Sequence, residues 1–239
     1  MIFQEKGTRH SHRGVIGVES AIVMIAFIIV AAALAFVVLN MGFTTSQMVK
    51  TTTIAGLEES SSSMKISGTI TAVGCIDSES SCFSIPRINA TNIPLKISKD
   101  GNSVNFSPDV ISIRYIGESI QYDNIYTGAI TADTYRQSIL AYRQAELETD
   151  AAFDAFNGAN PVNGTLPDET SAFLYWAKRL NSNQVLDVGE HAILAIAFAT
   201  NDRPYALEKI NFEIIVSNGA TLTVERDIPS ITHEVLDLG

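Results

Sequence analysis

The residues most clearly suited to take part in a reaction lie where a basic leader meets an apolar run near the N-terminus. Arg13 and Gly14 end the leader, and the five residues from Val15 to Glu19 precede an uncharged run over 20–49. A secretory signal peptide is cut after its apolar run, which is then lost. Here we predict a cut before the run, between Gly14 and Val15, because glycine lets a peptidase approach the scissile backbone closely. The alternative is an uncut basic flank of a membrane anchor.

A carboxylate follows this junction closely. A cut after Gly14 frees the α-amino group of Val15 and makes Glu19 the fifth residue of the mature chain. A charge inside a bilayer or a dry helix bundle is costly unless it is paired. We therefore predict that Glu19 pairs with the Val15 amine of its own or a neighbouring chain. The alternative is a solvated Glu19 at the headgroup boundary.

Two kinds of covalent modification are predicted. Cys75 and Cys82 are the two cysteines of the chain, and their short spacing favours a disulfide over two free thiols in an extracytoplasmic protein. Asn89, Asn105 and Asn163 each begin an Asn-x-Ser/Thr sequon, which on an exported protein is a candidate glycan site, although such short motifs also arise by chance.

A partial match to a calcium-binding loop lies in the C-terminal third. With Glu190 as the last ligand, the other ligand positions fall on Asn181, Asn183 and Asp187. Arg179 stands where the first acid belongs, and Gln184 stands where the loop glycine belongs. We therefore favour a structural turn over a metal site, and expect no metal or other cofactor.

The sequence lacks the usual signs of an enzyme or a nucleic-acid-binding protein. It contains no Gly-x-Ser-x-Gly, His-Glu-x-x-His, P-loop or Gly-x-Gly-x-x-Gly motif. Its formal net charge of −10 argues against nucleic acid, which is bound by basic surfaces. We expect a protein that is not an enzyme, with an acidic, soluble outer surface.

Three regions are predicted to position these residues. Residues 1–14 are the leader. Residues 15–63 contain no proline and form one long helix, apolar all round at first and long enough to span a bilayer. Residues 64–239 contain short strands with period-two alternation, beginning with Ile66, Gly68, Ile70 and Ala72.

Further strands are predicted at 110–116 and 192–198, and a core role is predicted for Tyr175 and Trp176. A hairpin joins 210–216 to 220–226 through Asn218-Gly219, which favours a type I′ turn. Residues 133–156 are interpreted as a short helix or an insertion. Asp133 could cap such a helix, and an apolar face is predicted for Ile139, Leu140, Tyr142 and Leu147.

These motifs together resemble the archaeal flagellins, or archaellins. Arg13-Gly14 followed by Val-Ile-Gly-Val-Glu is similar to the class III signal that archaellins share with bacterial type IV pilins. Residues 183–192, Asn201-Asp202-Arg203-Pro204 and residues 222–229 also resemble the family, whereas 75–167 match poorly. The resemblance implies an α+β fold, in which a long N-terminal α-helix is followed by an immunoglobulin-like antiparallel β-sandwich.

The resemblance also implies a function. Archaellins are structural subunits that polymerise into the archaellum filament used for swimming motility. The implied partners are copies of the chain itself, a prepilin-type peptidase, and an assembly ATPase with its membrane platform. The precursor would lie in the cytoplasmic membrane and the filament outside the cell. The alternatives are an adhesive type IV-like pilin and a single-span anchored surface protein.

Overall fold

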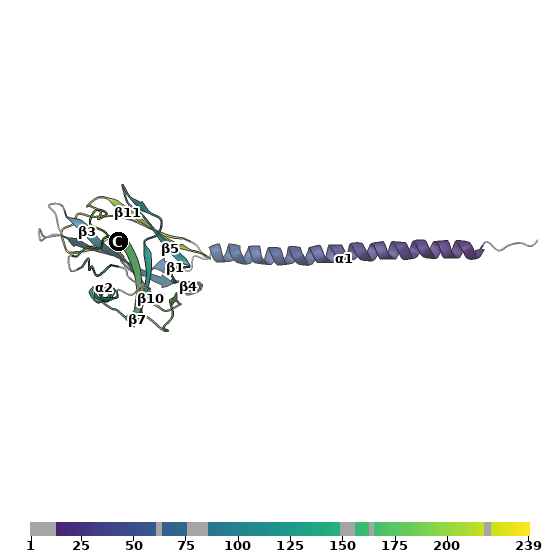
Figure 1. Cartoon of the computed structure of the whole chain (residues 1–239), viewed down its shortest axis with the longest axis horizontal. Helices are drawn as coiled ribbons and strands as arrows, with labels where there is room; N and C mark the ends of the chain where they lie inside the picture. Colours follow the sequence, from purple (N-terminus) through teal and green to yellow (C-terminus); the bar gives the residue numbers. More distant parts are fainter. Residues whose placement is uncertain (1–12, 61–63, 76–85, 149–155, 163–164, 218–220) are drawn as a thin grey trace, which may run out of the picture. The chain divides into compact units, whose positions relative to one another are not determined.

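The computed structural model describes residues 13–60, 64–75, 86–148, 156–162, 165–217 and 221–239. The chain divides into two compact units, Met1–Ala55 and Gly56–Gly239, and each is described by itself. The first is dominated by helix α1 (Arg13–Ser60), an unbroken helix of 48 residues (Figure 1). At about 1.5 Å per residue such a helix is roughly 72 Å long. The absence of proline explains its continuity.

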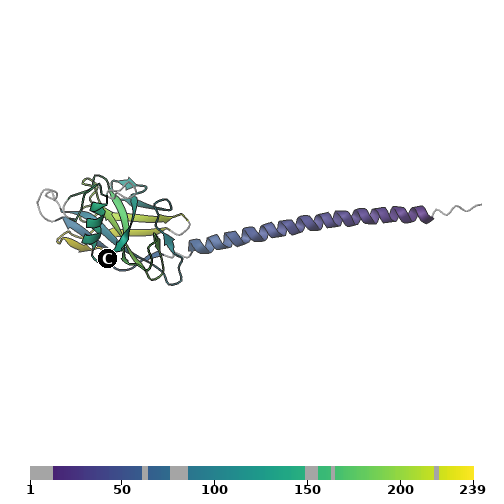
Figure 2. The ribbon, with the colours of Figure 1, turned by 60° about the horizontal axis from the view of Figure 1, so that its bottom comes forward.

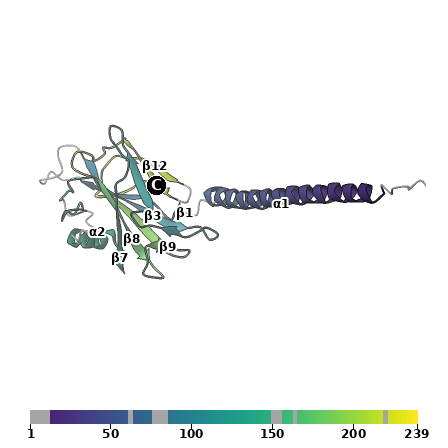
Figure 3. The same cartoon turned by 45° about the vertical axis from the view of Figure 1, so that its right-hand side comes forward.

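The second unit contains two main sheets and a helix (Figures 2 and 3). The seven-stranded sheet has the order β13-β2-β3-β10-β8-β7, with β1 also paired to β3. Its strands are β1 (Met64–Ile66), β2 (Thr71–Cys75), β3 (Arg87–Ile97), β7 (Tyr126–Thr134), β8 (Ser171–Lys178), β10 (His191–Ala197) and β13 (Val235–Asp237). The four-stranded sheet consists, in order, of β12 (Leu222–Asp227), β11 (Lys209–Val216), β5 (Ile111–Ile116) and β6 (Gln121–Tyr122). A two-stranded ladder joins β4 (Val104–Asn105) to β9 (Val185–Leu186), and α2 spans Ser138–Leu147.

The main core lies between the two sheets. Alternate residues of β5 and β11 point inward, as period-two patterning requires. Tyr115 stacks on Phe212 with ring centroids 5.2 Å apart, and Phe198 packs beside both. Trp176 is fully buried in this core, and Tyr175, on the other face of β8, is also buried, which confirms the core role predicted for both.

A second core lies on the opposite face of the seven-stranded sheet, under α2 (Figure 3). Tyr142 of α2 stacks on Phe156 at 5.7 Å and meets Phe173 of β8 edge-on at 5.6 Å. The Tyr142 hydroxyl donates a hydrogen bond to Asn92 Oδ1 at 3.1 Å. The unit therefore has three layers, one more than the predicted sandwich.

Three predicted details differ in the structure. The strand expected from Met64 onward is interrupted at Gly68, where a φ of 152° favours glycine, so β1 and β2 are separate. The sheets are not wholly antiparallel: β7 and β8 pair in parallel because the segment that joins them is a crossover containing α2. Asp133 does not cap α2, because β7 continues to Thr134 and the N-cap is Gln137.

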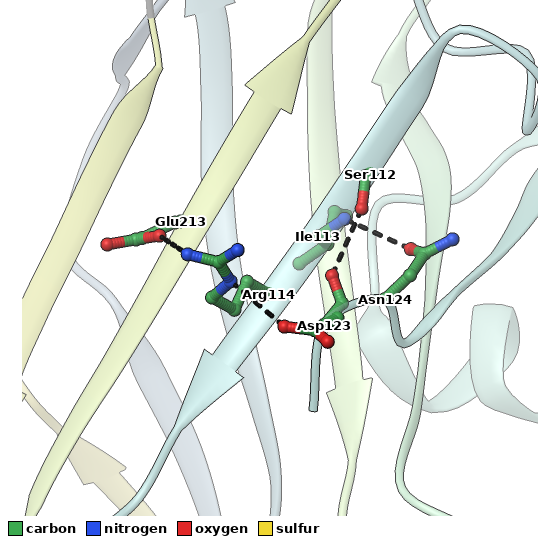
Figure 4. A network of polar contacts seen from close by, with 6 residues as sticks. All are labelled: Ser112, Ile113, Arg114, Asp123, Asn124 and Glu213. Atoms are coloured by element: carbon green, nitrogen blue, oxygen red, sulfur yellow. Dashed lines mark hydrogen bonds and ion pairs between the residues drawn. The ribbon is translucent and has the colours of Figure 1, made fainter. Parts of the chain in front are cut away.

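A loop between β6 and β7 ties the two sheets together (Figure 4). Asn124 Oδ1 accepts hydrogen bonds from the backbone N–H groups of Ile113 in β5 and Tyr126 in β7, both at 3.1 Å. The Ile125 N–H donates to the Ile113 carbonyl at 2.8 Å. The next residue of β5, Arg114, forms two ion pairs: its Nε lies 3.5 Å from Asp123 Oδ1, and its Nη1 lies 3.2 Å from Glu213 Oε2. The start of β7 is therefore held against β5.

Candidate functional site

The most unusual surface of the molecule is that of α1. Every large apolar side chain described between Val18 and Val49 is exposed, by 51 to 75%. The stretch Gly17–Thr53, of 37 residues, is long and apolar enough to cross a membrane. Fully burying one such side chain stabilises by about 1.5–3 kcal/mol. Such a helix must find an apolar environment outside its own chain.

Several polar groups on α1 are satisfied within the helix itself. No charged residue lies between Glu19 and Lys50. Three threonine hydroxyls donate to carbonyls of their own helix. They join Thr44 to Asn40 at 2.9 Å, Thr51 to Met48 at 2.9 Å and Thr52 to Met48 at 2.8 Å. These hydroxyls therefore need no partner from water or from another chain.

The predicted cleavage and pairing residues lie at the start of this helix. The bond between Gly14 and Val15 falls in the first turn of α1, where helices commonly fray. Glu19 is exposed one turn further on and has no ion-pair partner among the described residues. The Val15 amine exists only after a cut, so the pairing of Glu19 stays a prediction.

The predicted modification sites have different outcomes. Cys75 is the last residue of β2, whereas Cys82 and Asn163 lie outside the described residues. Asn105, half-buried in β4, accepts from the backbone and hydroxyl of Ser107 through Oδ1.

The buried position of Asn89 argues against the glycan predicted there. Asn89 is only 4% exposed in β3, a strand flanked by β2 and β10. Its Nδ2 donates to the Pro161 carbonyl at 3.2 Å and its Oδ1 accepts from Arg203 Nη1 at 3.1 Å. A glycan on Nδ2 would have to break both the packing and the hydrogen bond.

The loop with a partial calcium-site match is brought together as a hydrogen-bonded turn. Glu190 is 1% exposed, and its carboxylate accepts from the backbone N–H groups of Leu180, Asn181 and Asp187 at 2.7, 3.3 and 3.1 Å. Asn181 Nδ2 donates to Asp187 Oδ2 at 2.6 Å, and Asn183 Oδ1 accepts from a backbone N–H nearby. Most of the oxygens that a cation would need already accept hydrogen bonds within the turn, which favours the structural interpretation.

Arg203 is a buried cation that sequence reasoning did not single out. It is 2% exposed and donates to Asn89 and to the Thr200 carbonyl. Burial, and then the charge of Arg87, lower its pKa. The only signal in the sequence was its place in the Asn-Asp-Arg-Pro segment, between the predicted strands.

Comparisons with known proteins agree with this architecture. A model of the archaeal-type flagellin family matches residues 14–226. Probable flagellin 1 of Aeropyrum pernix is 32% identical over 221 residues, covering 91% of this chain and 93% of the relative. Flagellin FlaB2 of Saccharolobus shibatae is 30% identical over 52% of this chain and 40% of its own length.

Solved structures show the same fold. The archaeal flagellum of Methanospirillum hungatei superimposes with a TM-score of 0.57 at 20% identity, over 93% of this chain and 99% of that one. Archaeal flagellin FlaB1 of Methanocaldococcus jannaschii gives a TM-score of 0.51 at 14% identity, over 73% and 95%. These matches confirm the predicted α+β fold class. The family match over most of its length shows that this chain belongs to the archaeal-type flagellin family.

Proposed function

We propose that this chain is a structural subunit that polymerises through α1 into the archaellum filament used for swimming. The observation that carries the proposal is the uniformly exposed apolar surface of α1. Packing α1 helices against one another buries that surface without water, so close packing and dispersion dominate. The small residues Ala31, Ala32, Ala33 and Ala35 allow close approach of neighbouring helices. The role is structural rather than catalytic.

The proposed pathway begins in the cytoplasmic membrane. A prepilin-type peptidase cuts between Gly14 and Val15, and an assembly ATPase with its membrane platform transfers the chain from lipid to the filament. In the filament the new Val15 amine pairs with Glu19 of its own or a neighbouring chain, which neutralises both charges and sets the axial register. The acidic second unit faces the solvent outside the cell.

The test is the intact mass and N-terminal sequence of the protein in filaments sheared from cells. A chain beginning at Val15 in that fraction is the expected result. Full-length protein confined to the membrane would instead identify a single-span anchored protein. Loss of swimming in a deletion strain is also expected, whereas a strain that swims normally but no longer adheres would identify an adhesive pilin.

The same mass spectra test the remaining modifications. We propose a disulfide between Cys75 and Cys82 and glycans on Asn105 and Asn163. Unmodified peptides containing Asn105 and Asn163 would refute the glycans. Alkylation of both cysteines without prior reduction would refute the disulfide. For Glu19, a Glu19→Gln chain is expected to be cut normally but to assemble poorly, with exposed Glu234→Gln in the second unit as the control; equal filament yields would refute the pairing.

A further inference from the structure

Two arginines that are distant in the sequence lie together at the start of β3. Arg87 is the first residue of β3 and is half-buried, whereas Arg203, in the loop after β10, is only 2% exposed. The backbone brings them together, because Arg87 forms an isolated bridge with Tyr205 and the Ile88 N–H donates to the Pro204 carbonyl at 3.1 Å. These two residues are here called the arginine pair.

The two guanidinium groups of the arginine pair share one acceptor. Arg203 Nε and Arg87 Nη1 both donate to the Thr200 carbonyl, at 3.4 and 3.5 Å. Arg203 Nη1 also donates to Asn89 Oδ1 at 3.1 Å. Arg87 Nη2 donates to the hydroxyl of Tyr205, and the guanidinium carbon lies 4.1 Å from the centre of the Tyr205 ring. The acceptors found for the pair are thus a carbonyl, an amide and a hydroxyl, and none of them is a carboxylate.

Each guanidinium group keeps one buried donor that is not used. Arg203 Nη2 and Arg87 Nε are both buried, and neither forms a hydrogen bond to any described residue. The great majority of buried polar groups are paired, and a donor that has no protein partner commonly meets an ion or a water molecule. Since the two groups share the Thr200 carbonyl, one small ligand could accept from both donors.

The positive charge of the arginine pair is not balanced by acids of the described residues. Neither arginine forms an ion pair with any of them. Asp202 and Glu208, the acids closest to Arg203 in the described sequence, accept from two hydroxyls and from a backbone N–H instead. Burial lowers the pKa of Arg203, the charge of Arg87 lowers it further, and only Tyr205 opposes them. The two cations therefore lie close together without a described carboxylate to neutralise them.

We propose that the arginine pair binds a small inorganic anion. An anion would accept from both unused donors and also neutralise the two like charges, whereas a water molecule would satisfy only the hydrogen bonds. The anion must be small, either chloride or an oxyanion such as phosphate, because only two donors are free and Arg203 is almost fully buried. The inference concerns the second unit and does not depend on the proposed function.

A bound anion would join three segments of the second unit. Arg87 belongs to the start of β3, and Arg203 belongs to the loop that follows β10. Asn89, which accepts from Arg203, donates in turn to the Pro161 carbonyl at 3.2 Å and so reaches a third loop. We therefore expect the anion to stabilise the folded second unit by binding to it and not to the unfolded chain.

A carboxylate of the chain itself is the rival occupant. Asp77 and Glu79 precede Arg87 in the sequence and lie outside the described residues. The experiment therefore includes a chain with Asp77→Asn and Glu79→Gln beside the unsubstituted one.

The experiment measures thermal unfolding of the detergent-solubilised full chain by near-ultraviolet circular dichroism. At constant ionic strength, the bulky anion isethionate is exchanged for chloride or for phosphate. The unfolding midpoint should rise by about 3–6 °C when the bound anion is tenfold above its dissociation constant, and should then level off. A response to chloride alone would identify a monatomic ion, and a response to phosphate alone would identify an oxyanion.

Three variants separate binding at this site from the general effect of salts on stability. In Arg87→Met and Arg203→Met the anion-dependent rise should fall below about 1 °C, because one of the two cations is lost. Arg87 is half-buried, so its variant keeps the test valid if Arg203→Met does not fold. Arg136→Met is the control and should keep the full rise, since Arg136 is exposed and forms no ion pair with a described residue.

A second measurement does not depend on stability. The chloride or phosphate resonance in nuclear magnetic resonance should broaden when the folded unsubstituted chain or the Arg136→Met chain is added. The Arg87→Met chain should broaden it at least about threefold less, because exchange with the site is lost.

Several results would overturn the proposal. One is a midpoint that responds to neither anion, and another is an equal rise in the Arg87→Met and Arg136→Met chains. A response confined to the chain with Asp77→Asn and Glu79→Gln would assign the arginine pair to a carboxylate of the protein. A chain that binds the anion but forms no filaments would contradict the proposed function and leave the anion site standing.

Discussion

Alkaline pH should unfold the second unit, because four of the seven tyrosines are buried. Tyr115, Tyr126, Tyr142 and Tyr175 are at most 6% exposed, and burial raises the pKa of each hydroxyl above its usual value. In the unfolded chain a tyrosine ionises near pH 10. Above that pH the unfolded state binds fewer protons than the folded state, so stability is present below pH 10 and falls as pH rises.

The magnitude follows from the same four residues. At pH 11 each tyrosine that stays protonated in the folded state and ionises on unfolding lowers the free energy of unfolding by about 1.4 kcal/mol. The four together remove about 5–6 kcal/mol, which is comparable to the total stability of many domains, about 5–15 kcal/mol. The second unit should therefore unfold cooperatively between about pH 11 and 12.

The assay is a pH titration of the detergent-solubilised chain, followed by tyrosinate absorbance and near-ultraviolet circular dichroism. Tyr122 and Tyr135 should ionise before the four buried tyrosines, although the hydrogen bond to Asp202 raises the pKa of Tyr122 and partial burial raises the pKa of Tyr135. The other four should ionise in one step that coincides with loss of the dichroism. A Tyr175→Phe chain should show a smaller step. Ionisation of all seven near pH 10 with the dichroism intact would refute the reasoning.

Three further predictions concern stability of the second unit, each measured by chemical denaturation. Glu190→Gln should destabilise by about 2–4 kcal/mol, because an amide group would face backbone donors in the turn, whereas exposed Glu234→Gln should change little. Tyr142→Phe should cost about 1–2 kcal/mol, since Asn92 Oδ1 loses its donor; no change would mean that water replaces the hydroxyl. Gly74→Ala should cost about 1–3 kcal/mol, because the new Cβ would lie 2.8 Å from a side-chain methyl and 3.2 Å from a backbone carbonyl before β13; wild-type stability would contradict the tight packing there.

The sequence predicts the strongly patterned elements well. The long helix follows from an apolar run without proline, and α1 spans Arg13–Ser60 against the predicted 15–63. Strands β5, β10 and the β11–β12 pair also lie where alternation or a buried apolar run predicts them. The turn between β11 and β12 falls on residues outside those described. In these segments local pattern and tertiary packing agree, which is why a local rule suffices.

The sequence predictions fail where burial depends on packing between residues that are distant in the sequence. In α2 the larger aliphatic residues suggested the buried face, but of the four residues predicted there only Tyr142 is buried, with Ala141 and Ala145 beside it. Small alanines let the helix approach the sheet, so the bulky residues remain outside. The Asn89 sequon is likewise a local motif that carries no information on burial between two strands.

The threonine hydroxyls that form hydrogen bonds within α1 have a mechanical consequence. Since Thr44, Thr51 and Thr52 are bonded within their own helix, their hydroxyls are not needed to lock one helix to its neighbour. Helices held together mainly by dispersion can slide past one another in small increments without breaking directional bonds. We expect a filament core of this kind to be compliant and to bend under torque by small slips distributed over many helices.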